Sequence, residues 1–96
     1  MNRSVHDSIM PTVEIYTWQF CPFCFRAKAL LKQKGIKFTE YSIDGDNEAR
    51  SKMSERAGGR STLPQIFIND MSIGGCDELY ELESNNELNK LFGIKN

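Results

Sequence analysis

The sequence predicts an α/β domain in which one four-stranded mixed sheet is flanked by helices. Strand-like and helix-like segments follow one another in the order β-α-β-α-β-β-α-α. The first three segments have the lengths of a parallel βαβ unit, which is right-handed by rule. The two adjacent strands are joined by a two-residue turn and form an antiparallel hairpin. A single sheet that contains both units must have parallel and antiparallel pairs.

The first half of the chain supplies the parallel unit. Residues 13–17 are rich in β-formers and predict the first strand. A helix is expected over 22–34, and 36–43 predicts the second strand. Apolar residues at helical spacing support the helix: Ala27, Leu30 and Leu31. The apolar residues of the second strand are Phe38, Tyr41 and Ile43.

The second half supplies a helix over 48–57 and the hairpin, with strands over 65–68 and 71–73. A further helix begins within 74–77, and a last helical segment begins at residue 85 or 86. The apolar faces of these two helices are expected to contain Leu79, Leu82, Leu88, Leu91 and Phe92.

Charged residues on the outer faces of the helices are interpreted as solvated. They are Lys32 and Lys34 on the first helix and Glu81, Glu83 and Glu87 near the C-terminus. Arg26 is different, because it is close enough to the start of the first helix to influence an anionic ligand there.

Length and composition indicate one globular domain. The chain has 96 residues, 40% of them hydrophobic and 26% charged, with a formal net charge of −1. This charge does not favour nucleic acid or a membrane as a partner. Residues 1–11 are polar and aperiodic and are interpreted as a flexible leader with a solvated His6, which leaves 12–96 as the domain. Three cysteines without a secretory signal favour the cytoplasm over a disulfide-stabilised secreted scaffold.

The segment Cys21-Pro22-Phe23-Cys24 lies between the first strand and the first helix. A C-x-x-C beside a βαβ pattern is typical of a redox site in a thioredoxin-like fold. The free N–H groups at the helix start favour a thiolate, so the pKa of Cys21 is expected between ~3.5 and ~7.5. Zinc binding is a minor alternative, because the chain has only three cysteines and a remote His6.

Three segments together resemble the signature of glutaredoxins. They are Cys21-Pro22-Phe23-Cys24, Thr62-Leu63-Pro64 and Gly74-Gly75-Cys76-Asp77. The segments Ile15-Tyr16-Thr17 and Pro64-Gln65-Ile66-Phe67-Ile68 also resemble the small dithiol bacterial members. The resemblance covers about residues 12–92 and is specific, because three motifs occur in order at the right separations.

The resemblance implies an enzyme, a glutathione-dependent thiol–disulfide oxidoreductase of cell redox homeostasis. Cys21 corresponds to the nucleophile and Cys24 to the resolving cysteine, and the two form the redox-active disulfide. Protein disulfides and glutathione mixed disulfides are the implied substrates. Glutathione is the implied co-substrate, regenerated indirectly by glutathione reductase, with no metal expected. A cytoplasmic monomer is implied.

The resemblance also implies a glutathione-binding set: Trp18, Cys21, Phe23, Thr62, Leu63, Pro64, Gly75, Cys76 and Asp77. In it the backbone of Thr62 and Leu63 pairs with the cysteinyl part of glutathione, and Pro64 is a cis-proline that faces the cysteines. The γ-glutamyl end is received by Cys76 and Asp77, at a helix N-terminus that suits a carboxylate.

Two positions depart from the family pattern and leave alternatives open. Trp18 stands where members usually carry lysine, and Phe23 where they usually carry tyrosine. Arg60 or a lysine of the first helix is a candidate replacement for the lost charge. The first alternative, admitted by Trp18, is a redoxin reduced by thioredoxin reductase. The second is an iron–sulfur dimer, which C-P-F-C disfavours because related cluster carriers have C-G-F-S.

Overall fold

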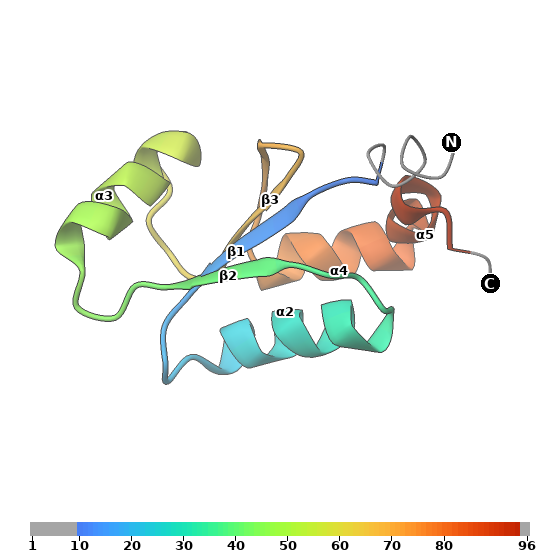
Figure 1. The fold of residues 1–96 in the computed structure, drawn as a ribbon, viewed down its shortest axis with the longest axis horizontal. Coiled ribbons are helices and arrows are strands. Elements are labelled where there is room, and N and C mark those ends of the chain that lie inside the picture. Colours follow the sequence, from blue (N-terminus) through green and yellow to red (C-terminus); the bar gives the residue numbers. More distant parts are fainter. Residues whose placement is uncertain (1–9, 95–96) are drawn as a thin grey trace, which may run out of the picture.

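The computed structural model describes residues 10–94 and confirms the mixed sheet (Figure 1). The strand order is β2-β1-β3-β4. Strand β1 (Val13–Thr17) pairs in parallel with β2 (Thr39–Ser42) and antiparallel with β3 (Gln65–Ile68). Strand β4 (Met71–Gly74) pairs antiparallel with β3. His6 and most of the predicted leader lie outside the described residues.

Helices cover both faces of the sheet. They are α2 (Pro22–Gln33), α3 (Asn47–Arg56), α4 (Cys76–Ser84) and α5 (Glu87–Phe92). Helices α2, α4 and α5 lie on one face, and α3 lies on the other (Figure 1). This arrangement is a thioredoxin-like fold, as the sequence predicted.

Two hydrophobic clusters hold these layers together. The larger joins alternate residues of the central strands to α2, α4 and α5; it includes Val13, Ile15, Leu31, Ile66, Leu79 and Leu88. The smaller lies under α3 and consists of Ile43, Met53, Ala57 and Phe67. Successive residues of β1 and β3 therefore alternate between the clusters, as the two-residue period of a strand requires.

The second strand is shorter than predicted. It spans only Thr39–Ser42, and all four of its residues are exposed. Ile36 and Ile43 are buried on either side of it, so the apolar signal over 36–43 came from its flanks. The strand lies at the edge of the sheet and pairs only with β1, so its side chains need no apolar pattern.

The predictions for three side chains, Leu91, Lys34 and Glu83, were wrong. Leu91 is 45% exposed, because the buried face of the short α5 consists of Leu88, Asn89 and Phe92. Lys34 and Glu83 are not simply solvated, because Lys34 Nζ lies 2.9 Å from Glu83 Oε1 and both side chains are half-buried or more. The fold brings the end of α2 beside the end of α4, which no local pattern could show.

Among residues 10–94, no helix is both long and apolar enough to span a membrane.

Candidate active site

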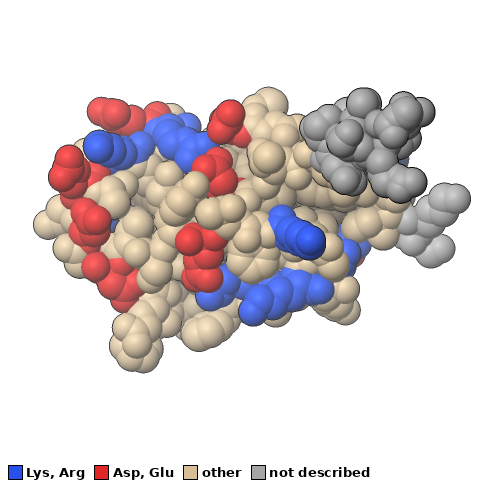
Figure 2. Space-filling model, in the orientation of Figure 1, with Lys and Arg blue, Asp and Glu red and all other residues tan. Residues whose placement is uncertain are grey.

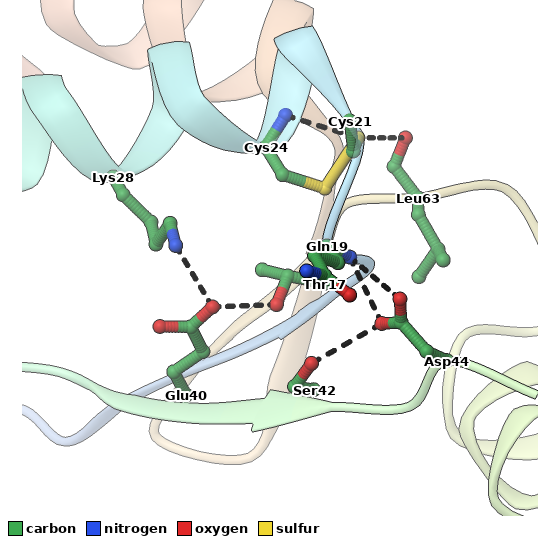
Figure 3. Close-up of a disulfide and its surroundings, with 9 residues drawn as sticks. All are labelled: Thr17, Gln19, Cys21, Cys24, Lys28, Glu40, Ser42, Asp44 and Leu63. Atoms are coloured by element: carbon green, nitrogen blue, oxygen red, sulfur yellow. Dashed lines mark hydrogen bonds and ion pairs between the residues drawn. A yellow bond between two sulfur atoms is a disulfide. The ribbon is translucent and has the colours of Figure 1, made fainter. Parts of the chain in front are cut away.

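The two cysteines of the C-x-x-C form a disulfide at the N-terminus of α2 (Figure 3). Their Cα atoms are 5.1 Å apart. Cys21 is the N-cap residue in an extended conformation, and its Sγ accepts a hydrogen bond from the Cys24 N–H at 3.1 Å. Cys21 is half-buried, whereas Cys24 is only 1% exposed. The sulfur of Cys21 is therefore the one that a second molecule can approach.

The loop before β3 lies against this disulfide. The Sγ of Cys21 is 3.9 Å from the carbonyl oxygen of Leu63 (Figure 3). The peptide bond between Leu63 and Pro64 is cis, as the resemblance implied. Residues 60–64 belong to no strand, so the Leu63 backbone lies outside the sheet.

A cleft of about 170 Å³ lies beside the disulfide. It is lined by Phe23, Thr62, Leu63, Pro64, Gly75, Cys76 and Asp77. These are seven of the nine residues of the predicted glutathione-binding set, from three separate segments of the chain. The structure therefore brings the three motifs together around one cavity.

Two glycines precede α4, and the second of them, Gly75, lines this cleft. A Cβ atom on Gly75 would lie 3.1 Å from the Pro64 carbonyl oxygen, so only glycine allows this close approach without a shift. Gly74 has a φ of +107°, and a Cβ there would lie 2.8 Å from the Glu78 side chain. The Gly75 N–H donates to Glu78 Oε1 at 2.7 Å, which fixes the first turn of α4.

Cys76 and Asp77 differ in exposure at this helix N-terminus. Cys76 is buried and Asp77 is exposed. Burial raises the pKa of the Cys76 thiol, although the positive charge of Arg26 opposes the shift. Cys76 therefore stays protonated at neutral pH, and Asp77 is the side chain that can accept from a ligand's cation.

Trp18 is joined to the other side of the site by Arg50, a residue that sequence reasoning missed. The guanidinium carbon of Arg50 lies 4.9 Å from the centroid of the Trp18 ring. The Nε of Arg50 donates to the Ser61 carbonyl oxygen at 3.0 Å. Arg50 is thus held between the loop before Cys21 and the loop before Pro64. No sequence signal connects residues 32 positions apart, so only the fold reveals this cation.

Asp44 fixes the loop that leads into Cys21. Its two carboxylate oxygens accept from the Gln19 N–H at 2.9 and 3.0 Å, and Oδ1 also accepts from Ser42 Oγ at 3.2 Å (Figure 3). Asp44 begins the turn between β2 and α3. The structure shows that this turn anchors the active-site loop.

A second carboxylate, Glu40, lies beneath the same loop (Figure 3). It accepts from Thr17 Oγ1 at 2.6 Å and from Lys28 Nζ at 2.9 Å. Burial opposes the ionisation of Glu40, but these hydrogen bonds and the lysine charge outweigh it and lower its pKa. Glu40 is therefore ionised at neutral pH and ties β2 to β1 and α2.

A larger hollow, of about 500 Å³, lies elsewhere and includes Pro11, Glu14, Lys37 and Asp70. No cysteine lines this hollow, and it is open to solvent. Its larger volume alone therefore does not identify it as the candidate active site. Among residues 10–94, no three histidine, cysteine or acidic side chains are grouped closely enough to hold a metal ion.

Comparison with known proteins agrees with the fold and the cysteine motif. The glutaredoxin family model matches residues 13–73. A probable glutaredoxin of Synechocystis sp. is 62% identical over 85 residues, which cover 88% of this chain and 78% of that protein. The solution structure of a Brucella melitensis glutaredoxin shares 48% identity and a TM-score of 0.75, over 88% of this chain and 91% of that one.

A buckwheat glutaredoxin–glutathione complex is similar in fold alone. It has a TM-score of 0.78 and 21% identity, over 95% of this chain and 86% of that chain. The chain belongs to the glutaredoxin family. Proteins of this family are oxidoreductases. The Cys21–Cys24 pair of this chain has the spacing of the dithiol members.

Proposed function

We propose that this protein is a glutathione-dependent thiol–disulfide oxidoreductase that reduces protein disulfides and glutathione mixed disulfides. The observation that carries the proposal is the half-exposed Cys21 sulfur at a helix N-terminus, bonded to a buried Cys24 beside the cleft. The family supplies the reaction class, and the geometry supports the roles of the residues.

The reaction begins with the reduced enzyme, whose Cys21 thiolate is the nucleophile. The N–H of Cys24 and the positive end of α2 favour the thiolate over the thiol. The thiolate attacks one sulfur of a protein disulfide, which forms a mixed disulfide and releases the other sulfur as a thiolate. The Cys24 thiolate then attacks the Cys21 sulfur, restores the Cys21–Cys24 disulfide and releases the second substrate thiolate.

Glutathione returns the two electrons. One glutathione thiolate opens the Cys21–Cys24 bond and forms a mixed disulfide at Cys21, with Cys24 leaving as the thiolate. A second glutathione thiolate attacks this mixed disulfide, which releases oxidised glutathione and the Cys21 thiolate. A glutathionylated protein follows a shorter route, because Cys21 takes the glutathione directly and Cys24 is not needed.

The cleft suits part of the tripeptide. The extended backbone of glutathione can pair with the Leu63 backbone, as a short added strand does. Its γ-glutamyl carboxylate suits the N–H groups at the start of α4, and its ammonium suits the Asp77 carboxylate. A cavity of about 170 Å³ is smaller than most ligand pockets, so the glycyl end extends beyond it.

Arg50 is the proposed partner of that glycyl carboxylate. Trp18 cannot pair with an anion, but its ring holds a guanidinium that can. Arg50 therefore takes over the charge of the lysine that is usual at position 18. This assignment replaces Arg60 and the helix lysines, which the sequence had suggested for the role.

The test compares two electron donors on one disulfide substrate. We expect NADPH consumption with glutathione and glutathione reductase to exceed that with thioredoxin reductase by at least about tenfold. Exposed Trp18, in place of a lysine, favours the second candidate, a redoxin reduced by thioredoxin reductase. Faster turnover with thioredoxin reductase would establish that candidate instead.

We further propose that the protein acts in the cytoplasm as a monomer.

A further inference from the structure

Four large aromatic side chains are exposed within eight residues around the disulfide. Phe20 is 84% exposed, Phe25 60%, Phe23 52% and Trp18 40%. The other exposed large apolar residues among 10–94 are Met10, Tyr41, Met71 and Leu91, which are scattered along the chain. A group of exposed rings at one site is characteristic of an interaction surface, whereas isolated exposed residues are ordinary.

Two of the four rings already have a place in the proposed mechanism. Phe23 lines the cleft, and Trp18 holds Arg50. Phe20 and Phe25 line no part of the cleft and stack on no other described ring. The proposed binding of glutathione therefore leaves these two rings without a role.

Phe20 and Phe25 occupy the N′ and N4 positions of α2, because Cys21 is its N-cap. Apolar residues at these positions often pack on each other as a hydrophobic staple. Here both remain more than half exposed, and the two rings make no contact with each other. Helix capping therefore does not account for them. Lys28 Nζ lies 5.3 Å from the centroid of the Phe25 ring, but more than half of each ring's surface stays available to an external side chain.

Charge around the pair limits what can bind. Figure 2 shows an uncharged corner where α2 begins, with lysine and arginine side chains farther along the helix. The first turn of α2 has no acidic residue, and Arg26 and Lys32 of this helix are exposed; the Arg26 guanidinium lies 5.0 Å from the ring centroid of Tyr80 on α4. A partner that covers the corner and continues along α2 would match an apolar group followed by negative charge.

We propose that Phe20 and Phe25 bind an apolar side chain adjacent to the target cysteine of a disulfide-bearing protein, with acidic residues of that protein facing Arg26 and Lys32. This inference rests on the proposed function. It specifies the class of protein substrate, namely proteins with an apolar side chain and acidic residues near the target cysteine. Phe20 and Phe25 line no part of the cleft, so we assign the pair to protein disulfides rather than to glutathione.

The test uses two disulfide-bridged peptides of equal length. In one, the cysteine is flanked by leucine and then two glutamates; in the other, serine and two lysines take these places. We expect the wild type to reduce the first peptide with a kcat/KM about tenfold higher than the second, mainly through KM. The double variant Phe20→Ser/Phe25→Ser should lower this ratio to about twofold or less.

Two controls separate docking from chemistry and from folding. The mixed disulfide of glutathione with 2-mercaptoethanol should be reduced equally well by the wild type and the double variant. Met71→Ser removes an exposed apolar side chain at the β3–β4 turn and should leave the peptide ratio unchanged. Circular dichroism then verifies that each variant is folded.

Each result decides one question. Wild-type enzyme that fails on the small mixed disulfide overturns the proposed function itself. Normal turnover of that substrate without peptide selectivity, or selectivity that survives in the double variant, overturns the docking proposal alone. A wild-type dimer that the double variant converts to a monomer would also overturn it, because the pair would then bind a second copy of the chain.

Discussion

The two cysteines of one tetrapeptide have very different access to solvent. Cys21 is half-buried at the N-cap, and Cys24 is enclosed within the first turn of α2. A substrate disulfide can therefore reach Cys21 but not Cys24. In the proposed mechanism, the buried sulfur of Cys24 therefore attacks only its neighbour Cys21, which makes the second step intramolecular and fast.

This asymmetry predicts different losses for two serine variants. Cys21→Ser should abolish all reduction, because serine is not ionised near neutral pH and forms no mixed disulfide. Cys24→Ser should keep reduction of the glutathione–mercaptoethanol disulfide and lose that of a protein disulfide. Coupled NADPH assays on both substrates measure this. Equal loss of both activities in Cys24→Ser would contradict the two-route mechanism.

Arg50 gives a second prediction at the scale of single residues. One exposed charge pair contributes about 0.2–1 kcal/mol, so Arg50→Gln should raise the KM for glutathione ~2–5-fold with kcat nearly unchanged. Trp18→Ala should have a similar effect, since it removes the ring that holds the guanidinium. Initial rates at varied glutathione measure both.

The matched control for this prediction is Arg60→Gln. Arg60 is exposed and was the candidate that the sequence suggested. Its KM for glutathione should equal that of the wild type. A larger effect from Arg60→Gln than from Arg50→Gln would return the role to Arg60.

Cys76 gives a prediction about pH. Burial raises the pKa of its thiol, so the reactive thiolate forms only at higher pH than in an exposed cysteine. In the fully reduced protein at pH 7, iodoacetamide should alkylate Cys76 at least about tenfold more slowly than Cys21. Peptide mass spectrometry over pH 6–10 would follow both sites. Equal rates at pH 7 would show that Cys76 is accessible and ionised.

At the scale of elements, α3 is fastened to the sheet by Arg56. Its Nη2 lies 2.8 Å from Glu14 Oε1 on β1 and 3.3 Å from Asp70 Oδ1 at the β3–β4 turn. The guanidinium also lies 4.0 Å from the Phe67 ring centroid. The hydrogen bond from Arg56 lowers the pKa of Glu14 below its usual 4.5, although burial opposes the shift.

This contact should make stability depend on pH. Because the folded pKa of Glu14 lies below the unfolded one, its contribution is complete above about pH 5 and is lost as pH falls through the folded pKa. Glu14→Gln should lower the free energy of unfolding by about 0.5–1 kcal/mol at pH 7 and by almost nothing at pH 2. Urea denaturation at both pH values measures the difference.

Glu48→Gln serves as the control for this measurement. Glu48 pairs with Lys52 at 3.6 Å, and both side chains are largely exposed. Its removal should change the free energy of unfolding by less than about 0.5 kcal/mol at pH 7. A pH-independent cost of Glu14→Gln would mean that its packing, not its charge, supports α3.

The elements themselves were predictable because their signals are local. The spacing of Ala27, Leu30 and Leu31 predicted α2, and the turn at Asn69-Asp70 predicted the hairpin. The limits of β2 were not predictable, since an edge strand with exposed side chains has no apolar pattern. Leu91 was misjudged for a related reason, because the burial of so short a helix depends on its neighbours.

The candidate site, too, combines features that have a local sequence signal with features that have none. Its three motifs were visible because each is a short contiguous segment with a distinctive composition. Asp44, Glu40 and Arg50 were not visible, because each is tied to the site by a partner far away in the sequence. Gln19, Lys28 and Trp18 lie 25, 12 and 32 residues away, respectively, and are brought close by sheet order and helix placement. The sequence therefore predicted the residues around the sulfur better than the residues that hold them.

At the scale of the whole molecule, the disulfide predicts a colourless monomer. Cys24 lies where it can return Cys21 to an intramolecular disulfide, which favours that bond over an iron–sulfur cluster shared between two chains. After anaerobic incubation with iron, sulfide and glutathione, we expect no absorbance near 400 nm and no dimer in gel filtration. A brown dimer would instead support the cluster-carrying alternative.

The positions of residues 10 and 94, where the described part of the chain begins and ends, have a practical consequence. Met10 and Ile94 line the same hollow, whereas the disulfide lies beyond the opposite end of β1 (Figure 1). A fluorescent protein fused on this side would leave the sulfur unobstructed while a short tether kept the two domains at high effective concentration. Because residues 10 and 94 lie close together, a linker between them would also allow circular permutation, with the new termini at an exposed turn such as Asn69-Asp70. The fold is therefore suited to a genetically encoded sensor that couples thiol exchange to an optical signal.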